Sequence, residues 1–418
     1  MTVSADEGVQ DSRDSAVEKD APNGDVHYDP YDADLNRDPY PMFARIREQA
    51  PLYYNAEHDF YALSRYDDVE AALLDHETFS SARGAVLEII KAGLDIPPGT
   101  LIFEDPPIHN IHRKLLSRIF TPRKVNALEP KIRQFTARCL DPLIGAGRFD
   151  FVKDLGAQMP MRVIGMLLGI PEADQEHVIE HGESTIRTER GGKMTDNPDG
   201  PIASGQAFAD YIDWRAQHPS DDIMTELLNA EFTDETGTLR RLGREELLLY
   251  LQVIATAGSE TTTRLIGWAG ELLSDHPDQR RALIADRSLL PAAVEEVVRF
   301  EPPAPHVTRY VTRDVTYYGE TVPAGSAMMM IVGAANRDPR RFGPDSERFD
   351  IHRPPRQHLG FGVGTHFCLG NALARLEGRI ALDEILQRFP DWHVDLTDAE
   401  LSPTSTVRGW ESMPALVD

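Results

Sequence analysis

Cysteine is nearly absent from this sequence. Only Cys139 and Cys368 occur in 418 residues, and no Cys-x-x-Cys pair is present. Two thiols cannot form the framework of cross-links found in small secreted domains, and they supply too few ligands for a zinc or iron–sulfur set. We therefore expect a protein of a reducing, cytoplasmic compartment.

Long apolar runs are also lacking. The most apolar segment, LLLYLQVIATAG at residues 247–258, is interrupted by Gln252 and followed by Ser259 and Glu260, and it is shorter than the ~20 residues that cross a bilayer. The first residues, MTVSADEGVQDSRDSAVEKDAPNGD, lack the apolar core of a signal peptide. We expect a buried helix at 247–258, no membrane anchor, and a disordered acidic leader over residues 1–28.

Positive charge is scarce relative to negative charge. Lys and Arg number 43 against 68 Asp and Glu, which gives a formal net charge of -25. A surface of this sign repels phosphates, so nucleic acid and anionic membranes are excluded as global partners. An acidic partner would have to bind a local basic surface.

Helical periodicity dominates the chain from about residue 106 to 290. Earlier, Pro41 stands at a plausible first helical turn, and Met42 and Ile46 follow at helical spacing. Strand-like runs, HVTRYVTRDVTYYG and AMMMIV, are gathered after residue 300. No internal repeat is present, so we expect one mainly α domain with a minor β portion over residues 29–418.

The segment HLGFGVGTHFCLG surrounds Cys368 with four glycines, and a helical pattern follows it. We expect that helix to begin at the cysteine. One interpretation is an inert buried thiol in a glycine turn. A second, a dinucleotide loop, is disfavoured because the third spaced glycine and the preceding hydrophobic strand are missing. The third is a metal thiolate, stabilised by a helix N-terminus and brought close to a flat cofactor by glycine backbone, and haem iron needs only one such ligand.

The same segment resembles the cysteine-ligand signature of the cytochrome P-450 superfamily. Phe361, Gly364, Cys368 and Gly370 stand at the spacing FxxGxxxCxG, and LARLE resembles the helix that follows in soluble bacterial members. The resemblance extends from about residue 29 to the end of the chain. It implies the cytochrome P-450 fold, a large helical lobe and a small β-rich lobe with haem b between them. Cys368 would be the axial ligand of the iron, and Gly362 would belong to the same cofactor-binding loop.

Upstream, EEVVRF places Glu296 and Arg299 in an ExxR arrangement. Alone, such a pair is usually an exposed ion pair on a helix. In this order it resembles the buried structural triad of the family, with Arg348 of SERF as the third member. The implied role is to fix the long irregular connection NRDPRRFGPDSERFDIHRPPRQ and the haem pocket.

The segment ATAGSETTTRL places a glycine, an acid and three threonines inside an apolar helix. The threonines could bond back to carbonyl groups one turn earlier while Glu260 faces solvent. By resemblance, however, AGSETT is the acid–alcohol pair above the haem. Ala257 would then contact the cofactor, Gly258 would make room for dioxygen, Thr261 would hydrogen-bond it, and Glu260 would help to relay protons.

Haem carries two carboxylates, so cationic groups are expected near its edge. Four residues resemble the propionate-binding positions of soluble bacterial members: His109 and Arg113 at HxxxR spacing, Arg309 of HVTRYV, and His366 inside the cysteine loop. Outside this context each would more often be a solvated surface residue.

One stretch is basic in an acidic chain. Residues 112–125, HRKLLSRIFTPRKV, contain five Lys or Arg residues and no acid. It could be an ordinary solvated helix face. Our hypothesis is that Lys114, Arg118 and Lys124 form the docking surface for an acidic ferredoxin, which would be steered there electrostatically.

Several apolar segments could line a substrate pocket. Residues 81–103 resemble the variable loop over the haem, and 305–307 and 407–410 are further candidate walls with Ile254, while 182–201 has the polar, Gly-rich composition of a lid. Such walls favour a hydrophobic small molecule such as a terpenoid, steroid or fatty acid.

The predicted function is therefore a monomeric haem-thiolate monooxygenase that inserts one atom of O2, with electrons from NAD(P)H through ferredoxin reductase and ferredoxin. Two alternatives remain open: a peroxide-driven peroxygenase or isomerase on the same fold, and a haem-thiolate ligand sensor without turnover.

Overall fold

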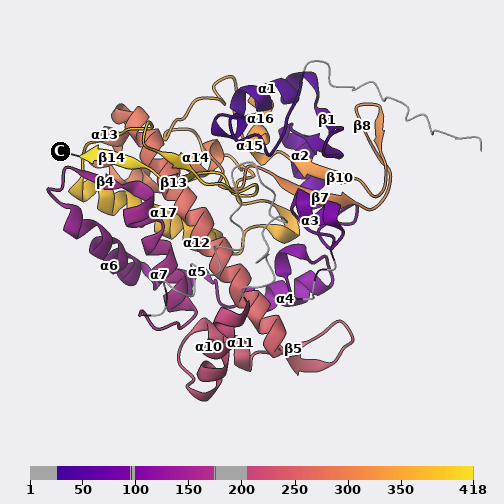
Figure 1. Ribbon diagram of the computed structural model, residues 1–418, viewed down its shortest axis with the longest axis horizontal. Helices are drawn as coiled ribbons and strands as arrows, with labels where there is room; N and C mark the ends of the chain where they lie inside the picture. The colour runs from indigo at the N-terminus through magenta and orange to yellow at the C-terminus, as the bar shows by residue number, and fades with distance from the viewer. Residues whose placement is uncertain (1–25, 95, 97–98, 174, 176–204, 418) are drawn as a thin grey trace, which may run out of the picture.

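The long helix α12, Arg244–Asp275, crosses the molecule, and the other helices of the larger lobe pack around it (Figure 1). The computed structural model describes residues 26–94, 96, 99–173, 175 and 205–417. The remaining described α-helices are α1 Tyr40–Gln49, α2 Tyr66–Leu74, α3 Leu87–Ala92, α4 Ile108–Ser117, α5 Pro122–Asn126, α6 Glu129–Leu140, α7 Gln158–Leu167, α10 Gly205–Gln217, α11 Ile223–Asn229, α13 Pro277–Ala285, α14 Leu290–Phe300, α15 Val332–Ala335, α16 Pro339–Phe342 and α17 Asn371–Arg388.

Local sequence sets both ends of α12. At its start, the side chain of Glu246 reaches back and accepts a hydrogen bond from the backbone N–H of Gly243 at 2.7 Å, which satisfies a donor that the helix leaves free. Two acids in the first turn also favour the positive end of the helix dipole. At its end, His276 leaves the helical conformation, with φ of -121° and ψ of 67°, because Pro277 follows it.

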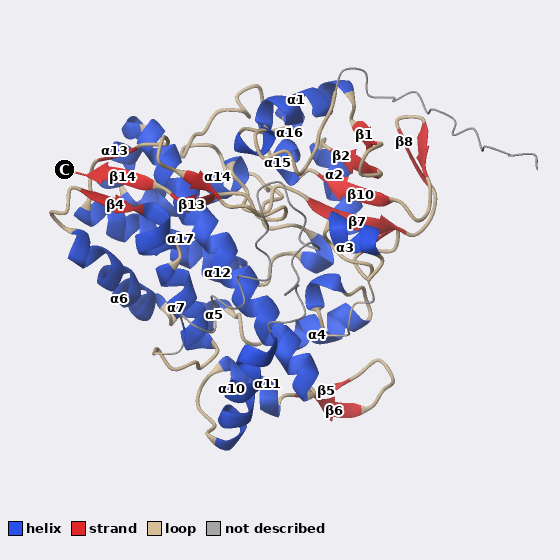
Figure 2. Ribbon diagram, viewed as in Figure 1, coloured by secondary structure: helices blue, strands red, loops and turns tan. Residues whose placement is uncertain are grey.

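The strands form a smaller lobe and several short ribbons, as Figure 2 shows. Their bounds are β1 Leu52–Asn55, β2 Phe60–Leu63, β3 Phe79–Ser80, β4 Arg148–Asp150, β5 Glu231–Thr233, β6 Leu239–Arg241, β7 Val307–Val311, β8 Val315–Tyr317, β9 Glu320–Val322, β10 Ala327–Met330, β11 Trp392–Val394, β12 Glu400–Leu401, β13 Trp410–Ser412 and β14 Pro414–Val417. The main sheet has the order β1-β2-β10-β7-β3. Its central strand β10 runs parallel to β2 and antiparallel to β7, with Met329 opposite Ala62 and Thr308.

These elements confirm the mainly α fold and correct two details. Strands are not confined to the region after residue 300, because β1 and β2 pair early in the chain and complete their sheet through β10. The C-terminal boundary predicted for the disordered leader, residue 28, was also too late in the chain. Val26 and Tyr28 are buried, and the backbone N–H of Tyr28 donates to the hydroxyl of Tyr53 at 2.9 Å, since both side chains pack onto α1 and β1.

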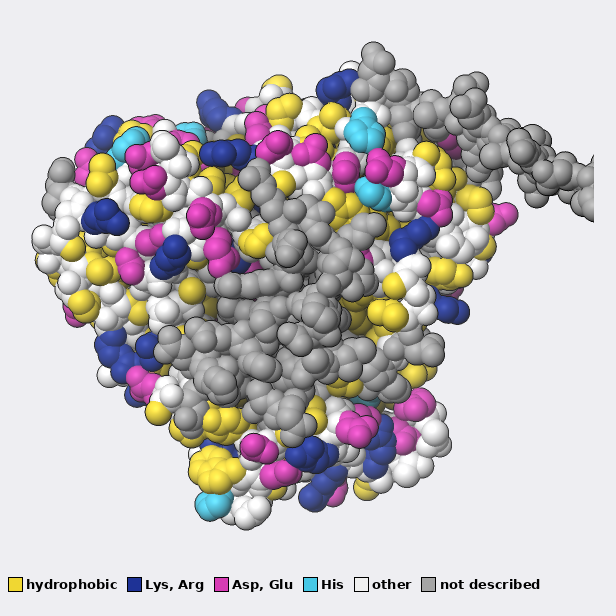
Figure 3. Space-filling model, viewed as in Figure 1, with side chains coloured by type: hydrophobic (Ala, Val, Ile, Leu, Met, Phe, Trp, Pro, Cys, Tyr) yellow, Lys and Arg dark blue, Asp and Glu magenta, His cyan; other side chains and the backbone are white. Residues whose placement is uncertain are grey.

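Most of the hydrophobic core lies in the helical lobe. Its largest cluster of buried apolar side chains joins α12 to α6, α7, α14 and α17, and two smaller clusters lie on either side of the main sheet. Among the described residues, no helix is both long enough and apolar enough to cross a membrane. On the face seen in Figure 3, acidic and basic side chains are interspersed over the part that is drawn in colour.

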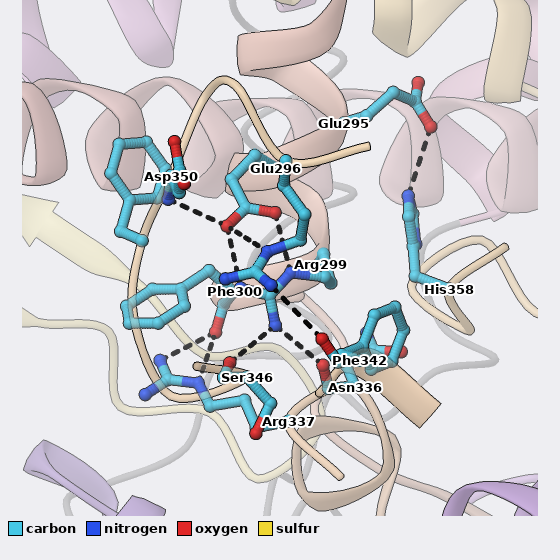
Figure 4. A network of polar contacts seen from close by, with 12 residues as sticks. Glu295, Glu296, Arg299, Phe300, Asn336, Arg337, Phe342, Ser346, Asp350 and His358 are labelled. Atoms are coloured by element: carbon cyan, nitrogen blue, oxygen red, sulfur yellow. Dashed lines mark hydrogen bonds and ion pairs between the residues drawn. The ribbon is translucent and has the colours of Figure 1, made fainter. Parts of the chain in front are cut away.

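A buried ion network anchors the irregular connection after α16. Arg299 on α14 donates to both carboxylate oxygens of Glu296 at 2.7 Å, and to the carbonyl groups of Asn336 and Ser346 at 2.8 and 2.9 Å (Figure 4). The backbone N–H of Asp350 donates to Glu296 at 2.9 Å. The α14 pair therefore holds the connection through its main chain.

The third member of this network is Arg353, and the prediction of Arg348 was wrong. The Arg353 guanidinium lies 3.2 Å from Glu296, and its side chain is 8 % exposed. The Arg348 side chain is 67 % exposed and pairs with Asp350, and only the carbonyl group of Arg348 reaches Arg299. A turn closed by the backbone bond from Arg353 to Asp350 directs the later arginine inward.

Candidate active site

A cavity of about 390 Å³ lies between α12, α4 and the loop that carries Cys368. Most of its wall is apolar. The residues that form the wall away from the cysteine include Val86, Leu87, Leu101, Phe103, Leu116, Phe120, Ile164, Val253, Ile254, Val307 and Val407. Predicted wall segments 81–103, 305–307 and 407–410 thus contribute in part, whereas the predicted lid at 182–201 lies outside the described residues.

The cysteine loop is closed by its own backbone. The N–H of Cys368 donates to the carbonyl group of Phe361 at 2.8 Å, and the N–H of Gly362 donates to that of Leu359 at the same distance. Gly362 and Gly364 both have φ of +68°, a conformation that side chains with a Cβ rarely adopt. The glycines are therefore required by the path of the chain that brings the thiol to the cavity.

The Cys368 thiol lines this cavity at the approach to α17. Burial raises its pKa, while the backbone N–H groups of Gly370 and Asn371 and the charges of Arg113 and Arg375 act in the opposite direction. The helix begins at Asn371 and not at the cysteine, because Gly370 occupies the capping position. Because the helix begins three residues after the cysteine, the backbone N–H groups of Gly370 and Asn371 lie near the sulfur, as expected for a site that stabilises a thiolate.

Four cationic or hydrogen-bonding side chains gather on the same cavity: His109, Arg113, Arg309 and His366. The rings of His109 and His366 are 4.4 Å apart between centroids, and within the part of the chain that the structure describes neither buried ring nitrogen of His109 has a hydrogen-bond partner. Arg309 is buried, and its guanidinium donates to the neighbouring carbonyl group of Thr308 at 2.9 Å. The sequence predicted this set, and the fold brings all four together.

The electrostatics of this cluster call for an anion. Burial lowers the pKa of Arg309 to about 10 and that of His366 to about 3, and it also lowers the pKa of His109 and Arg113. The neighbouring Asp105 already accepts from Ser80 and from the N–H of Ser81. A buried cation without a carboxylate is costly, so a ligand with two carboxylates fits this wall.

Haem meets all of these requirements. The Cys368 thiolate would hold the iron, and the cluster of His109, Arg113, Arg309 and His366 would bind the propionates. A Cβ added to Gly370 would meet no atom within 4 Å, so the floor beside the sulfur is open to a flat group. When bound, a thiolate-ligated haem supplies the chemistry of O2 activation.

Above the thiol, α12 contributes Ala257, Gly258 and Thr261 to the cavity. The hydroxyl of Thr261 donates to the carbonyl group of Ala257 at 2.7 Å, so it is oriented within the helix and its lone pairs remain available. A Cβ on Gly258 would lie 2.6 Å from Cδ1 of Ile164. Glycine at this position therefore permits close packing of α12 on α7 as well as space in the cavity.

Glu260 is placed differently from Thr261. It is buried, but it does not line the cavity, and its carboxylate forms an ion pair with Arg264 one turn later. Arg264 also donates to Ser402 and to the carbonyl group of Trp410, on the C-terminal segment. Proton relay by Glu260 stays a prediction, and in this arrangement it requires the ion pair to open.

Sequence reasoning missed a second acid, Glu377 on α17. Glu377 is buried and lines the cavity, and the hydroxyl of Thr262 bonds its side chain, while its Oε1 has no hydrogen-bond partner among the residues that the structure describes. Burial raises its pKa well above the ordinary value of 4.5, while the hydrogen bond from Thr262 acts in the opposite direction. The signal was present, since Glu377 falls on the apolar stripe between Leu373 and Ile380.

The remaining predicted residues serve the frame of the site. Phe361 is stacked under the guanidinium of Arg375 at 4.3 Å, and Arg375 is bound by Glu295. Neither Phe361, Gly362 nor Gly364 lines the cavity. They shape the loop, and of the glycines predicted in the cysteine loop Gly370 borders the cavity.

Fold and cavity together fit a haem-binding protein, and comparison with known proteins agrees. Residues 210–410 match the family model described as Cytochrome P450. Cytochrome P450 130 of Mycobacterium tuberculosis is 37% identical over 389 residues, which cover 90% of this chain and 94% of the relative. The 6-deoxyerythronolide B hydroxylase of Saccharopolyspora erythraea is 34% identical over 401 residues, with 91% and 96% covered.

Solved structures give the same result. CYP109E1 from Bacillus megaterium, solved in complex with testosterone, superposes with a TM-score of 0.83 at 28% identity, covering 92% of this chain and 99% of that one. The chain belongs to the cytochrome P450 family. It is a haem-binding monooxygenase, an oxidoreductase that acts on small molecules with O2.

Proposed function

We propose that this monooxygenase inserts one oxygen atom from O2 into a hydrophobic small molecule of the terpenoid, steroid or fatty-acid type, at haem b held by Cys368. The observation that carries the proposal is the pairing of a partly buried thiol with a cluster of Arg and His side chains on one otherwise apolar cavity. An apolar wall recognises a substrate through burial of its hydrocarbon surface. The names of two relatives, a 6-deoxyerythronolide B hydroxylase and a protein solved with testosterone, support a lipophilic substrate class.

Within this reaction each part of the chain has a distinct task. Thr261 would accept a hydrogen bond on the dioxygen side of the cavity, because its own hydroxyl hydrogen is donated to Ala257. The carboxyl group of Glu377 and the hydroxyl of Thr262 lie on the same cavity and could pass a proton to it. The apolar wall excludes water, which favours transfer of oxygen to substrate over loss of electrons to solvent.

Electrons would come from NAD(P)H through ferredoxin reductase and an acidic ferredoxin. Lys114 and Arg118 are exposed near the C-terminal end of α4, the helix that carries Arg113 to the cavity. Lys124 is already paired with Glu226 at 2.7 Å, so it contributes less free positive charge. The docking surface therefore centres on Lys114 and Arg118, with Lys124 at its margin.

The test is reconstitution with a surrogate ferredoxin and reductase. We expect NAD(P)H consumption and O2 uptake that depend on a hydrophobic substrate found by displacement of iron-bound water. Persistent absence of turnover with functional donors would favour a ligand sensor, and turnover with peroxide alone would favour a peroxygenase.

Docking is tested separately. Lys114→Glu and Arg118→Glu should slow reduction by ferredoxin at low salt, more than Lys124→Glu does, while Lys153→Glu on the exposed part of η4, Phe151–Gly156, serves as a control of equal charge change. Unchanged reduction kinetics in the first two variants would contradict the assignment of this surface.

A further inference from the structure

A second hollow lies directly behind one wall of the active-site cavity. This outer chamber measures about 490 Å³ and is formed by the N-terminal segment around residues 30–37 and the C-terminal segment 399–411. It shares His306, Thr406 and Val407 with the active-site cavity. The partition between the two spaces is therefore one residue thick.

The partition is held at one end and at its tip. All of residues 401–408 are partly exposed, and Arg408 fixes one end of this segment, because its guanidinium bonds Glu301 and the carbonyl groups of Asn36 and Arg37. Its tip is held by Ser405, whose carbonyl group bonds the Nε2 of His306 at 3.1 Å and whose hydroxyl donates to Glu88 at 2.5 Å. These two contacts of Ser405 close the partition between the outer chamber and the cavity at its tip.

The hydrogen bond to the carbonyl group of Ser405 decides the tautomer of His306. A carbonyl oxygen only accepts, so Nε2 carries the hydrogen and Nδ1 presents a lone pair. Nδ1 has no partner among the described residues. Burial lowers the pKa of His306 to about 4, so the ring is neutral at physiological pH. An unsatisfied buried acceptor is costly, and a ligand with a hydroxyl or N–H group would relieve that cost.

The outer chamber differs in character from the cavity. Tyr31, Leu401 and Trp410 give it apolar surface, while Arg37 and Glu400 place charges of opposite sign on its wall. A ligand group of either charge would be attracted by one of these two side chains, Arg37 or Glu400, and repelled by the other. An uncharged polar group suits this lining best.

We propose that the outer chamber is the second half of the substrate site, which receives the uncharged, hydroxyl-bearing end of an amphiphilic substrate whose apolar part occupies the cavity. His306 accepts a hydrogen bond from that substrate at the boundary and so acts as a specificity-determining residue. The proposal rests on the proposed function, since the cavity must also accommodate haem and then leaves limited room for a large substrate. Ser405 moves aside as the substrate bridges the two spaces.

The test uses imidazoles that ligate haem iron. One probe is compact, 4-phenylimidazole, and the others carry alkyl tails of increasing length, each with and without a terminal hydroxyl. Binding is measured from the shift of the haem absorption band. We expect a tail length at which the hydroxyl increases affinity, and this advantage should fall about fivefold to tenfold in His306→Phe.

A second variant fills the outer chamber without touching the cavity. Ala399→Trp should weaken binding of the long probes and leave 4-phenylimidazole unaffected, while Ala71→Trp on the exposed side of α2 serves as a matched control. Equal binding of every tailed probe to wild type, His306→Phe and Ala399→Trp would overturn the proposal. Failure of 4-phenylimidazole to bind wild type would instead count against the haem-thiolate function.

Discussion

Replacing Arg353 by alanine removes the third member of the buried network on α14. Its guanidinium lies 3.2 Å from Glu296 and donates to the carbonyl groups of Asp345 and Arg348 at 2.8 Å. Breaking a buried ion pair from one side costs about 3–5 kcal/mol. Since Glu296 keeps Arg299 and the N–H of Asp350, we expect the lower end, about 3 kcal/mol.

Arg348→Ala is the matched control, because it removes the same charge five residues earlier in the chain. The Arg348 side chain is mostly exposed and lies 3.1 Å from Asp350, so its loss should cost about 0.5 kcal/mol. Urea unfolding, followed by tryptophan fluorescence, measures both variants, and the fraction of protein that retains haem is read alongside. Equal destabilisation by the two variants, or a larger effect of Arg348→Ala, would refute this assignment of the network.

Three further predictions concern the cavity. Above pH 4.5 Glu377 ionises in the unfolded chain but keeps its proton in the folded protein, so the free energy of unfolding falls as pH rises until the folded pKa is reached. Glu377→Gln lacks this ionisation, so in urea unfolding its free energy of unfolding should rise relative to wild type by about 1.4 kcal/mol per pH unit over that range. Gly258→Ala should weaken substrate binding because its Cβ would press on Cδ1 of Ile164, and adding Ile164→Val, which deletes that atom, should restore binding in optical titrations. Arg309→Met should preserve the urea midpoint of the haem-free protein but lower haem retention, measured by transfer to apomyoglobin; unchanged retention would contradict its role at the propionates.

Local patterns predicted the elements that depend on local chemistry. Pro41 and the apolar spacing after it gave α1, and the apolar run at 247–258 gave the middle of α12. The run HVTRYV likewise gave β7. In contrast, β1 and β2 are four residues each, and they are stabilised by β10, far along the chain. Such long-range pairing leaves little trace in a short segment.

In the candidate site, too, some features could be predicted from the sequence and others depend on how the chain folds. The cysteine and its glycine loop carry chemistry in their residue types, whereas His109, Arg113, Arg309 and His366 were assigned to the propionates through their resemblance to family positions. Arg348 and Arg353 could not be distinguished from sequence, because the connection that contains them has no periodicity to say which side chain turns inward. For Glu260, the partner was visible in the sequence, since Arg264 stands one helical turn later.

The central claim is that Cys368 supplies the thiolate that binds haem iron. The difference spectrum of the dithionite-reduced carbon monoxide complex tests it most directly, with Cys139→Ala as the control that removes the other cysteine. We predict a strongly red-shifted Soret band in wild type and in Cys139→Ala, and its loss in Cys368→Ala. Retention of that band in Cys368→Ala, or its absence from freshly purified haem-loaded wild type, would contradict the account.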